Sequence, residues 1–93
     1  MAEPRLSVVI ISYECRDVLL RCLDSLGTAL REGDEIILVD NASTDGTVQE
    51  VRARHPAVRC IANLENIGFA RAVNGALPLA RGRLTLLLNP DTT

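Results

Sequence analysis

The stretch Glu35-Ile-Ile-Leu-Val-Asp-Asn-Ala-Ser-Thr-Asp-Gly-Thr47 passes from an apolar run into a cluster of small polar residues. Ile36 to Val39 has the length of a strand, and a continuous apolar run is typical of a parallel strand covered on both faces. The polar residues would then lie at the carboxyl end of this strand, where open α/β sheets bind their ligands. The stretch predicts a buried strand that leads into a site, with Ser43, Thr44 or Asp45 able to cap the next helix. A plain polar strand-to-helix turn is the alternative interpretation.

Length and composition limit the class of protein. The chain has 93 residues and a formal charge of −2, so we expect one small domain with no electrostatic surface for nucleic acid or an acidic membrane. Cys15, Cys22 and Cys60 match no zinc or redox spacing, which indicates reduced, mostly buried thiols and a cytoplasmic location. No apolar run approaches the ~18 residues of a membrane span, and the first residues lack the apolar centre of a signal peptide.

The pattern of the first half of the chain predicts two strands joined by a helix. Residues 6–12 form a second apolar run of strand length. Between residues 15 and 30, apolar side chains recur at steps of three and four and predict one helical stripe that packs on the sheet: Val18, Leu19, Cys22, Leu23, Leu26 and Leu30. Because a helix connects them, the two strands should be parallel with a right-handed crossover.

The second half continues the alternation. A short helix over 47–54 should end at His55-Pro56, with His55 exposed, because proline disfavours helical backbone in the residue before it. The pattern of residues 57–62 predicts an edge strand, and Arg59 within it indicates that one side of this strand is partly solvated. A helix from Phe69 should end or kink near Pro78, and residues 83–89 form the fourth strand. The order predicts an α/β fold with a mainly parallel sheet between helices.

The polar loops of such a sheet should meet at one edge. Tyr13-Glu14, residues 40–45 and residues 89–91 all follow strands, and residues 63–68 lead into a helix at the same edge. Helix amino termini, and a metal held on oxygen ligands, could receive an anionic diphosphate there. The turn at residues 12–16 has no glycine, and the chain has no Gly-Lys-Ser/Thr loop, so a Rossmann dehydrogenase and a P-loop NTPase are both excluded.

Four blocks in this order resemble the nucleotide-binding half of a family 2 glycosyltransferase with the GT-A fold. They are Ser7-Val-Val-Ile-Ile-Ser-Tyr13, Val39-Asp-Asn-Ala-Ser-Thr-Asp-Gly-Thr47, Asn63-x-x-Asn-x-Gly-Phe-Ala-x-Ala-x-Asn-Gly75 and Leu87-Leu-Asn-Pro-Asp91. The Asn-Pro-Asp and Gly-Phe-Ala forms are similar to the rhamnosyltransferase-like branch. The resemblance implies inverting transfer of a sugar from a UDP- or dTDP-linked donor to an acceptor hydroxyl. It also implies a three-layer, Rossmann-like half with four strands in the order 3-2-1-4 and helices on both faces.

The resemblance also implies roles for individual residues. Asp40 and Asn41 would bind the base and ribose, within a nucleotide-binding set of Ser12, Tyr13, Glu14, Asp40, Asn41, Asn66, Gly68 and Arg71. Asp91 would hold Mg²⁺ or Mn²⁺ against the diphosphate, with Asn89 standing where the first aspartate of the family's Asp-x-Asp motif usually stands.

Five residues of these motif blocks and of the loops between them have a second interpretation. Asp45 lies nearby and serves equally well as a helix cap. For Glu14 and Arg71, a solvated surface charge is as good an interpretation as a role in nucleotide binding. Tyr13 and Phe69 lie inside otherwise apolar patterns, which favours packing over base stacking.

The general base and acceptor half of the family would begin after Thr93. We therefore expect residues 1–93 to be a single donor-binding subdomain, truncated before the acceptor half, inactive by itself and without a catalytic residue. The alternative is a non-enzymatic α/β binding or assembly module. With no later strands, Leu84, Leu86, Leu87 and Leu88 would form an exposed edge strand, which predicts a homodimer through residues 84–89.

Overall fold

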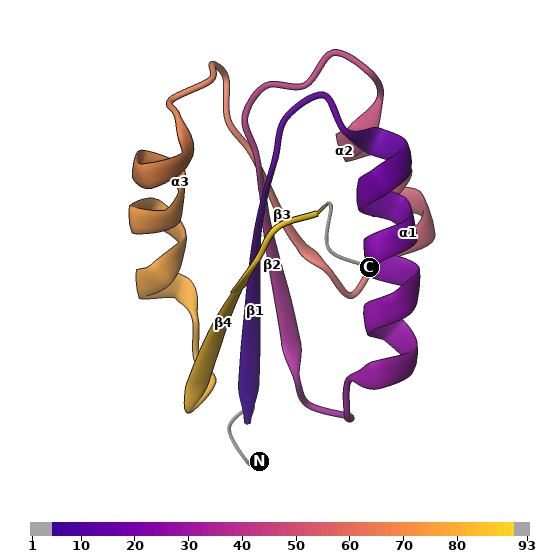
Figure 1. Cartoon of the computed structure of the whole chain (residues 1–93), viewed down its shortest axis with the longest axis vertical. Coiled ribbons are helices and arrows are strands. Elements are labelled where there is room, and N and C mark those ends of the chain that lie inside the picture. The colour runs from indigo at the N-terminus through magenta and orange to yellow at the C-terminus, as the bar shows by residue number, and fades with distance from the viewer. Residues whose placement is uncertain (1–4, 91–93) are drawn as a thin grey trace.

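The computed structural model describes residues 5–90, in which strands and helices alternate (Figure 1). Their bounds are β1 (Leu6–Ser12), α1 (Arg16–Ala29), β2 (Glu35–Asp40), α2 (Thr47–Arg54), β3 (Arg59–Ala62), α3 (Phe69–Ala76), a 3-10 turn at Leu77–Leu79, and β4 (Leu84–Leu88). The four strands pair only in parallel, in the order β3-β2-β1-β4. The predicted order is confirmed, and within the described part the sheet is wholly parallel.

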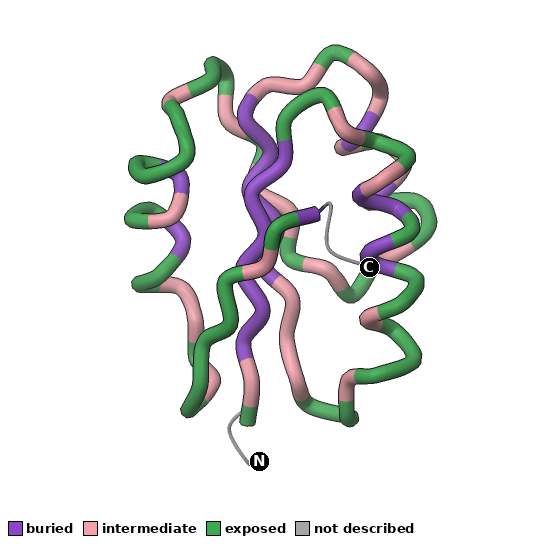
Figure 2. The backbone as a smooth tube through the Cα atoms, in the orientation of Figure 1, coloured by how far each residue is buried: buried purple, intermediate pink, exposed green. Residues whose placement is uncertain are grey.

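Helices cover both faces of the sheet, so the predicted three layers are confirmed. In Figure 1, α1 and α2 lie on one side of the strands and α3 lies on the other. Successive residues of β1 point to opposite faces. Val8 and Ile10 pack with Leu19 on the α1 side, while Val9 and Ile11 pack with Ala72 on the α3 side. Figure 2 shows buried residues along β1 and β2, the two central strands, and on the helices that pack against them.

The stripe on α1 is wider than its spacing predicts. Leu19, Cys22 and Leu23 are buried as expected. Leu20 lies outside the predicted stripe but is also buried at 7% exposure. Because the core-facing stripe of a globular helix spans roughly 100° or more, a residue beside the strict three-and-four spacing can still reach the sheet.

The region between α2 and β3 differs from the prediction in two ways. The His55 side chain is only 21% exposed, and its Nε2 lies 3.0 Å from Asp24 Oδ1 of α1. The prediction of an exposed helix end is therefore wrong, because α1 and α2 cover the same face and the end of α2 meets α1. The strand begins at Arg59 and not at Ala57, because the Val58 amide donates to the His55 carbonyl in a turn. Arg59 itself is exposed, which confirms a partly solvated edge strand.

The connection into β4 is fixed by backbone packing at the amino end of the sheet. Helix α3 ends at Ala76 and the chain passes into the turn that contains Pro78, as predicted. Gly82 then crosses β1 so closely that an added Cβ would lie 2.6 Å from the Ser7 nitrogen. The Gly82 amide donates to Ser7 Oγ (2.7 Å), and Ser7 Oγ donates to the Glu35 carboxylate.

The Glu35 carboxylate also accepts a hydrogen bond from the Arg81 amide at 2.6 Å. Desolvation raises the pKa of Glu35, but the hydrogen bonds from Ser7 and Arg81 outweigh it and hold that pKa below its ordinary value. The carboxylate therefore ties the segment before β4 to β1 and β2.

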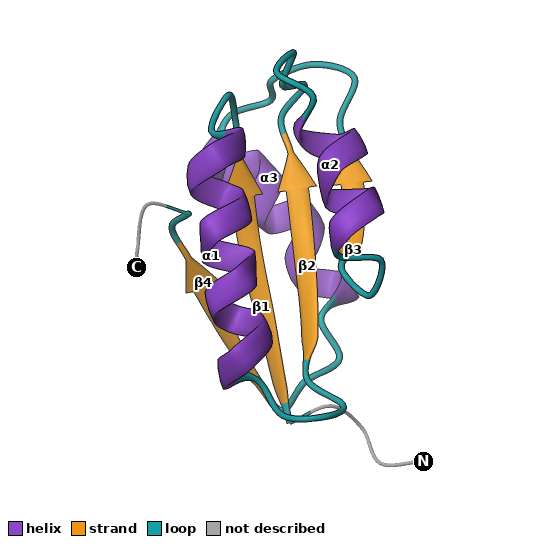
Figure 3. Cartoon of the chain, turned by 90° about the vertical axis from the view of Figure 1, so that its right-hand side faces the viewer, coloured by secondary structure: helices purple, strands orange, loops and turns teal. Residues whose placement is uncertain are grey.

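The β4 edge is exposed as predicted, with one exception. Leu84, Leu86 and Leu87 are 62%, 44% and 42% exposed. Leu88 is half-buried and packs against the core on the α1 side, so its predicted place in the exposed set is wrong. Figure 3 shows β4 at the outer edge of the sheet, and among residues 5–90 it pairs only with β1.

Candidate functional site

The loops that follow β1, β2 and β3 lie together at the carboxyl edge of the sheet, at the top of Figure 1. Two backbone hydrogen bonds extend the sheet pairing into these loops. The Asn41 amide donates to the Ser12 carbonyl, and the Asn63 amide donates to the Asp40 carbonyl, each at 2.9 Å. The parallel register brings the loops together, because Ser12 pairs with Asp40 and Asp40 pairs with Ala62 at the strand ends.

Asp40 is the buried centre of this edge, with 1% of its surface exposed. Its Oδ1 accepts hydrogen bonds from Ser12 Oγ and Ser43 Oγ, both at 2.7 Å, and its Oδ2 accepts one from the Ser43 amide at 2.8 Å. A buried carboxylate requires such partners, because burying the charge without them is very costly. Two predicted site residues, Ser12 and Asp40, are therefore brought together by a direct hydrogen bond.

Asn41 joins the second and third loops and is 3% exposed. Its Oδ1 accepts a hydrogen bond from Asn63 Nδ2 at 2.9 Å, and its Nδ2 donates to the Gly68 carbonyl at 3.3 Å. Asn66 Oδ1 accepts from the Gly68 amide at 2.9 Å. Asn41, Asn66 and Gly68 thus form one connected group. Asn63, which the site prediction omitted, belongs to it, and the only signal was its place in the same motif block.

Asp45 is bonded to the amino termini of two helices. Its Oδ2 accepts from the Arg16 amide at the start of α1 (3.0 Å), and its Oδ1 accepts from the Thr47 amide at the start of α2 (3.2 Å). Desolvation raises the pKa of Asp45, but the hydrogen bonds from the Thr47 side chain and from the Arg16 and Thr47 amides outweigh it and lower that pKa. These bonds give Asp45 the helix-capping role that the sequence offered as its second interpretation.

Glu14 lies on the surface but is not merely solvated. Its amide donates to Ser43 Oγ at 2.8 Å, and its carboxylate accepts from Thr44 Oγ1 at 3.0 Å and from the Thr44 amide. Glu14 therefore joins the first loop to the second. Arg71 is exposed on α3, in agreement with either interpretation of its charge.

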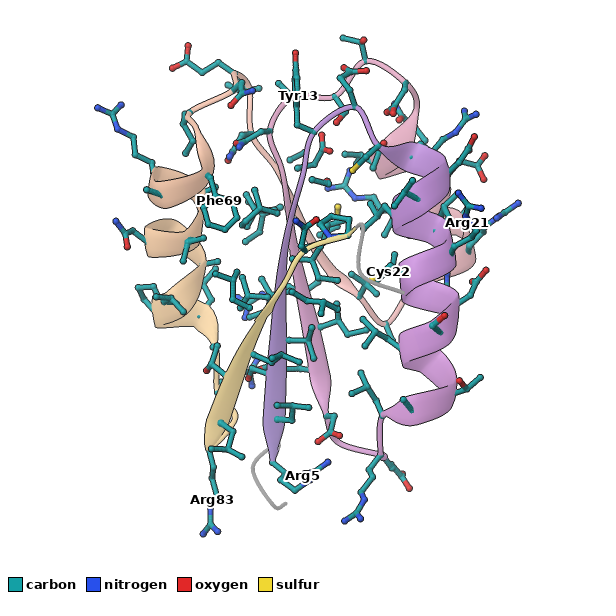
Figure 4. All side chains as sticks on the ribbon, viewed as in Figure 1. Arg5, Tyr13, Arg21, Cys22, Phe69 and Arg83 are labelled. Carbon is teal, nitrogen blue, oxygen red and sulfur yellow. The ribbon has the colours of Figure 1, made fainter. Side chains whose placement is uncertain are left out.

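The packing interpretation of two aromatic residues is wrong. Tyr13 is 53% exposed and Phe69 is 57% exposed. Tyr13 follows the last residue of β1, and its side chain projects from the carboxyl edge away from the sheet (Figure 4). Phe69 is the first residue of α3, ahead of the turns whose Ala72 and Ala76 meet the sheet. The apolar neighbours of each residue in the sequence belong to the core, but each aromatic residue itself is more than half exposed.

The predicted metal ligands are only partly described. Asn89 is exposed just after β4, and Asp91 lies outside the described residues. Among residues 5–90, no group of three or more His, Cys, Asp or Glu side chains is placed to hold a metal ion. The nearby carboxylates of Asp40 and Asp45 are already engaged by protein donors. The described residues therefore do not fit a metal ion by themselves.

Among residues 5–90, Cys15, Cys22 and Cys60 form no disulfide; Cys22 is buried and the other two are half-buried. Burial raises the pKa of the Cys22 and Cys60 thiols.

Across the part of the chain that the structure describes, no helix is both long and apolar enough to cross a membrane.

The chain belongs to glycosyl transferase family 2, because its residues 7–93 match the sequence model of that family. It is 41% identical over 69 residues to N-acetylglucosaminyl-diphospho-decaprenol L-rhamnosyltransferase of Mycobacterium tuberculosis, covering 74% of this chain and 22% of that protein. It is 33% identical over 86 residues to the Escherichia coli UDP-Glc:alpha-D-GlcNAc-diphosphoundecaprenol beta-1,3-glucosyltransferase WfaP, covering 91% of this chain and 34% of that protein. The chain thus spans about a fifth to a third of these relatives.

Solved structures of glycosyltransferases share the fold. The mannosyltransferase PcManGT from Pyrobaculum calidifontis, in complex with GDP-Man and Mn²⁺, matches with a TM-score of 0.84 and 32% identity over 98% of this chain and 28% of its own. TarS of S. aureus, in complex with UDP-GlcNAc, matches with a TM-score of 0.81 and 26% identity over 94% of this chain and 26% of its own. The predicted family and the nucleotide-binding half of the GT-A fold are confirmed.

Proposed function

We propose that this chain is the donor-binding part of an inverting glycosyltransferase and that the 93 residues alone do not catalyse transfer. The parent reaction would move a sugar from a UDP- or dTDP-linked donor to an acceptor hydroxyl. The observation that carries the proposal is the gathering of three loops at the carboxyl edge around Asp40 and Asn41. Open α/β sheets bind nucleotides at this edge, and the PcManGT and TarS structures with the same fold hold GDP-Man and UDP-GlcNAc.

The site residues divide into a buried frame and an exposed surface. Ser12, Asp40 and Asn41 are at most 3% exposed, and their polar atoms fix the loops relative to one another. Tyr13 and Arg71 are exposed, so an aromatic face and a cation are available to a base and to an anionic diphosphate. Asn66, Gly68 and Glu14 complete the proposed set. In this arrangement, the chain binds and orients the donor.

We propose that a divalent cation, Mg²⁺ or Mn²⁺, binds together with the diphosphate and not before it. The described residues offer no ligand set of their own, so the phosphate oxygens would supply part of the coordination, with Asn89 and Asp91 as the protein ligands. Such an ion neutralises charge on a departing diphosphate. An inverting displacement also requires a base that takes the proton of the acceptor hydroxyl, and we assign no residue of this chain to that role.

Titration calorimetry of the whole chain with UDP, dTDP and GDP tests the proposal. We expect weak binding of UDP or dTDP that Mn²⁺ strengthens, and Tyr13→Ala should weaken it by about 1 to 3 kcal/mol if a base stacks there. Leu77→Ala removes a similarly exposed side chain outside the proposed site and should leave binding unchanged. No heat and no shift in melting temperature at millimolar nucleotide with metal would reject the function for this chain.

A specific observation also favours an assembly role for the chain on its own. Within residues 5–90, strand β4 pairs only with β1 and so lies at an edge of the sheet, and its Leu84, Leu86 and Leu87 are exposed. We propose that two copies pair these edges antiparallel about a twofold axis, which satisfies the free backbone groups and buries leucines of both copies. Antiparallel pairing also keeps Arg83 of each copy at opposite ends of the joined strands. Sedimentation should show a dimer at micromolar concentration that Leu86→Glu dissociates, and a monomer at all concentrations would reject pairing.

A further inference from the structure

Three residues form hydrogen bonds between the first and second loops, and we name Glu14, Ser43 and Thr44 the inter-loop latch. The Glu14 amide donates to Ser43 Oγ at 2.8 Å. In the other direction, the Thr44 amide and Thr44 Oγ1 donate to Glu14 Oε1. Ser43 is itself held by Asp40 through its amide and its hydroxyl. The latch is therefore anchored on the buried carboxylate at the end of β2.

Each of the two loops contains a residue in a backbone conformation that residues other than glycine seldom adopt. Glu14 has φ of 51° and Ala42 has φ of 65°. Residues other than glycine are uncommon in this left-handed region, and they persist where their surroundings fix them. For Glu14, these surroundings are Ser43 and Thr44 of the opposite loop. Ala42 lies between Asn41 and Ser43, and Ser43 is held by Asp40 as well as by the latch. Loss of the latch should therefore allow the first loop to leave the left-handed conformation at Glu14.

Tyr13 lies between two anchored residues. On one side, Ser12 donates its hydroxyl to Asp40. On the other side, Glu14 is bonded to Ser43 and Thr44. The Tyr13 side chain makes little contact with the core, so its direction depends on the backbone that carries it (Figure 4). The latch thus sets the orientation of the exposed aromatic ring at the carboxyl edge.

We propose that Glu14 is a positioning residue of the nucleotide site, whose carboxylate clamps the β2–α2 loop and holds Tyr13 in place without touching the ligand. The inference rests on the proposed function. One carboxylate oxygen already accepts two hydrogen bonds from Thr44. A negative side chain also repels an anionic diphosphate, so direct phosphate contact would not account for a contribution to binding. Binding sites depend on such supporting hydrogen bonds to hold the contacting residues in their bound geometry.

The first test compares UDP affinity, measured by calorimetry with Mn²⁺, among variants of the full chain. Glu14→Gln keeps a carbonyl oxygen that can accept from Thr44 and should bind within about twofold of the original chain. Glu14→Ala loses the acceptor and should bind about tenfold more weakly. Glu32→Ala is the control, because it removes the same charge from an exposed turn at the other end of the sheet. Equal losses for Gln and Ala, or no loss for Ala, would overturn the proposal.

A double-mutant cycle separates positioning from contact. Thr44→Val removes the hydroxyl that donates to Glu14. If Glu14 acts through Thr44, the pair Glu14→Ala and Thr44→Val should bind UDP no more weakly than Glu14→Ala alone. Additive losses would show that Glu14 contacts the ligand independently, which overturns the proposal.

Amide hydrogen exchange distinguishes failure of the latch from failure of the proposed function. Exchange at Thr44 should be faster in Glu14→Ala than in Glu14→Gln, in the absence of any ligand. Unchanged exchange overturns the latch while leaving nucleotide binding intact. If the original chain binds no nucleotide but Thr44 exchange still depends on Glu14, the proposed function fails, and the role of the latch in binding fails with it.

Discussion

Replacing Asp45 by alanine should destabilise the chain through two helices at once. The Asp45 carboxylate accepts the Arg16 amide at the start of α1 and the Thr47 amide at the start of α2. Loss of one such capping interaction typically costs about 1 kcal/mol. Because two helix ends lose a partner, we expect the free energy of unfolding to fall by about 2 kcal/mol. For a domain of this size, this corresponds to a melting temperature lower by about 10 °C.

The assay is urea unfolding followed by circular dichroism, with Asp17→Ala as the matched control. Asp17 is also an aspartate at the start of α1, but it is exposed and makes a surface ion pair with Arg16 at 3.2 Å. Exposed pairs of this kind contribute about 0 to 1 kcal/mol. A loss in Asp45→Ala no larger than that in Asp17→Ala would refute the assignment of Asp45 as a cap of both helices.

The pH dependence of the same variant supplies an independent check. The pKa of Asp45 is lower in the folded chain than the ordinary value of about 3.9. The contribution of Asp45 is therefore fully present above that ordinary value and is lost as the pH falls through the lower folded pKa. The difference in unfolding free energy between the original chain and Asp45→Ala should be constant near neutral pH and shrink below about pH 4. A difference that grows in acid would contradict the sign of this shift.

Three further substitutions test the packing of the segment before β4 and the buried residues of the site. Gly82→Ala should lower the free energy of unfolding by about 1 to 3 kcal/mol, because the new Cβ would lie 2.6 Å from the Ser7 nitrogen. Gly75→Ala, within α3 and with open space around its Cβ, should raise it by up to about 1 kcal/mol, and equal effects in urea unfolding would contradict this reasoning. Asp40→Ala should abolish nucleotide binding and lower stability, because Ser12 and Ser43 lose their acceptor. Full nucleotide affinity in Asp40→Ala would show that the frame is not needed.

Much of the fold could be predicted because the strands of a parallel sheet carry an unambiguous pattern. The apolar runs that became β1 and β2 are buried on both faces, and the helical stripe of α1 meets one of those faces. The Pro78 turn also follows from a local rule, since proline cannot continue a helix. The order of the strands came from the resemblance to the family and not from periodicity, which carries no information on which strands are neighbours.

The details that failed depend on tertiary contacts. His55 is half-buried because α1 lies beside the end of α2, and no local signal marks that contact. Tyr13 and Phe69 look like core residues in sequence, but each lies where its element leaves the core. At the site, the residue types were predictable, whereas the division between a buried frame and an exposed surface was not. That division is set by hydrogen bonds across loops about 28 residues apart in sequence, such as Ser12 to Asp40.

The central claim is that the carboxyl edge of the sheet binds a nucleoside diphosphate, and NMR titration of the labelled chain with UDP and Mg²⁺ tests it most directly. We expect the amide signals of Tyr13, Asn41 and Gly68 to shift together and to saturate with one dissociation constant. Signals at the opposite end of the sheet, such as those of Gly33 and Gly82, should remain in place. Shifts confined to the β4 edge, or no saturable shift at the carboxyl edge at millimolar UDP, would contradict the claim.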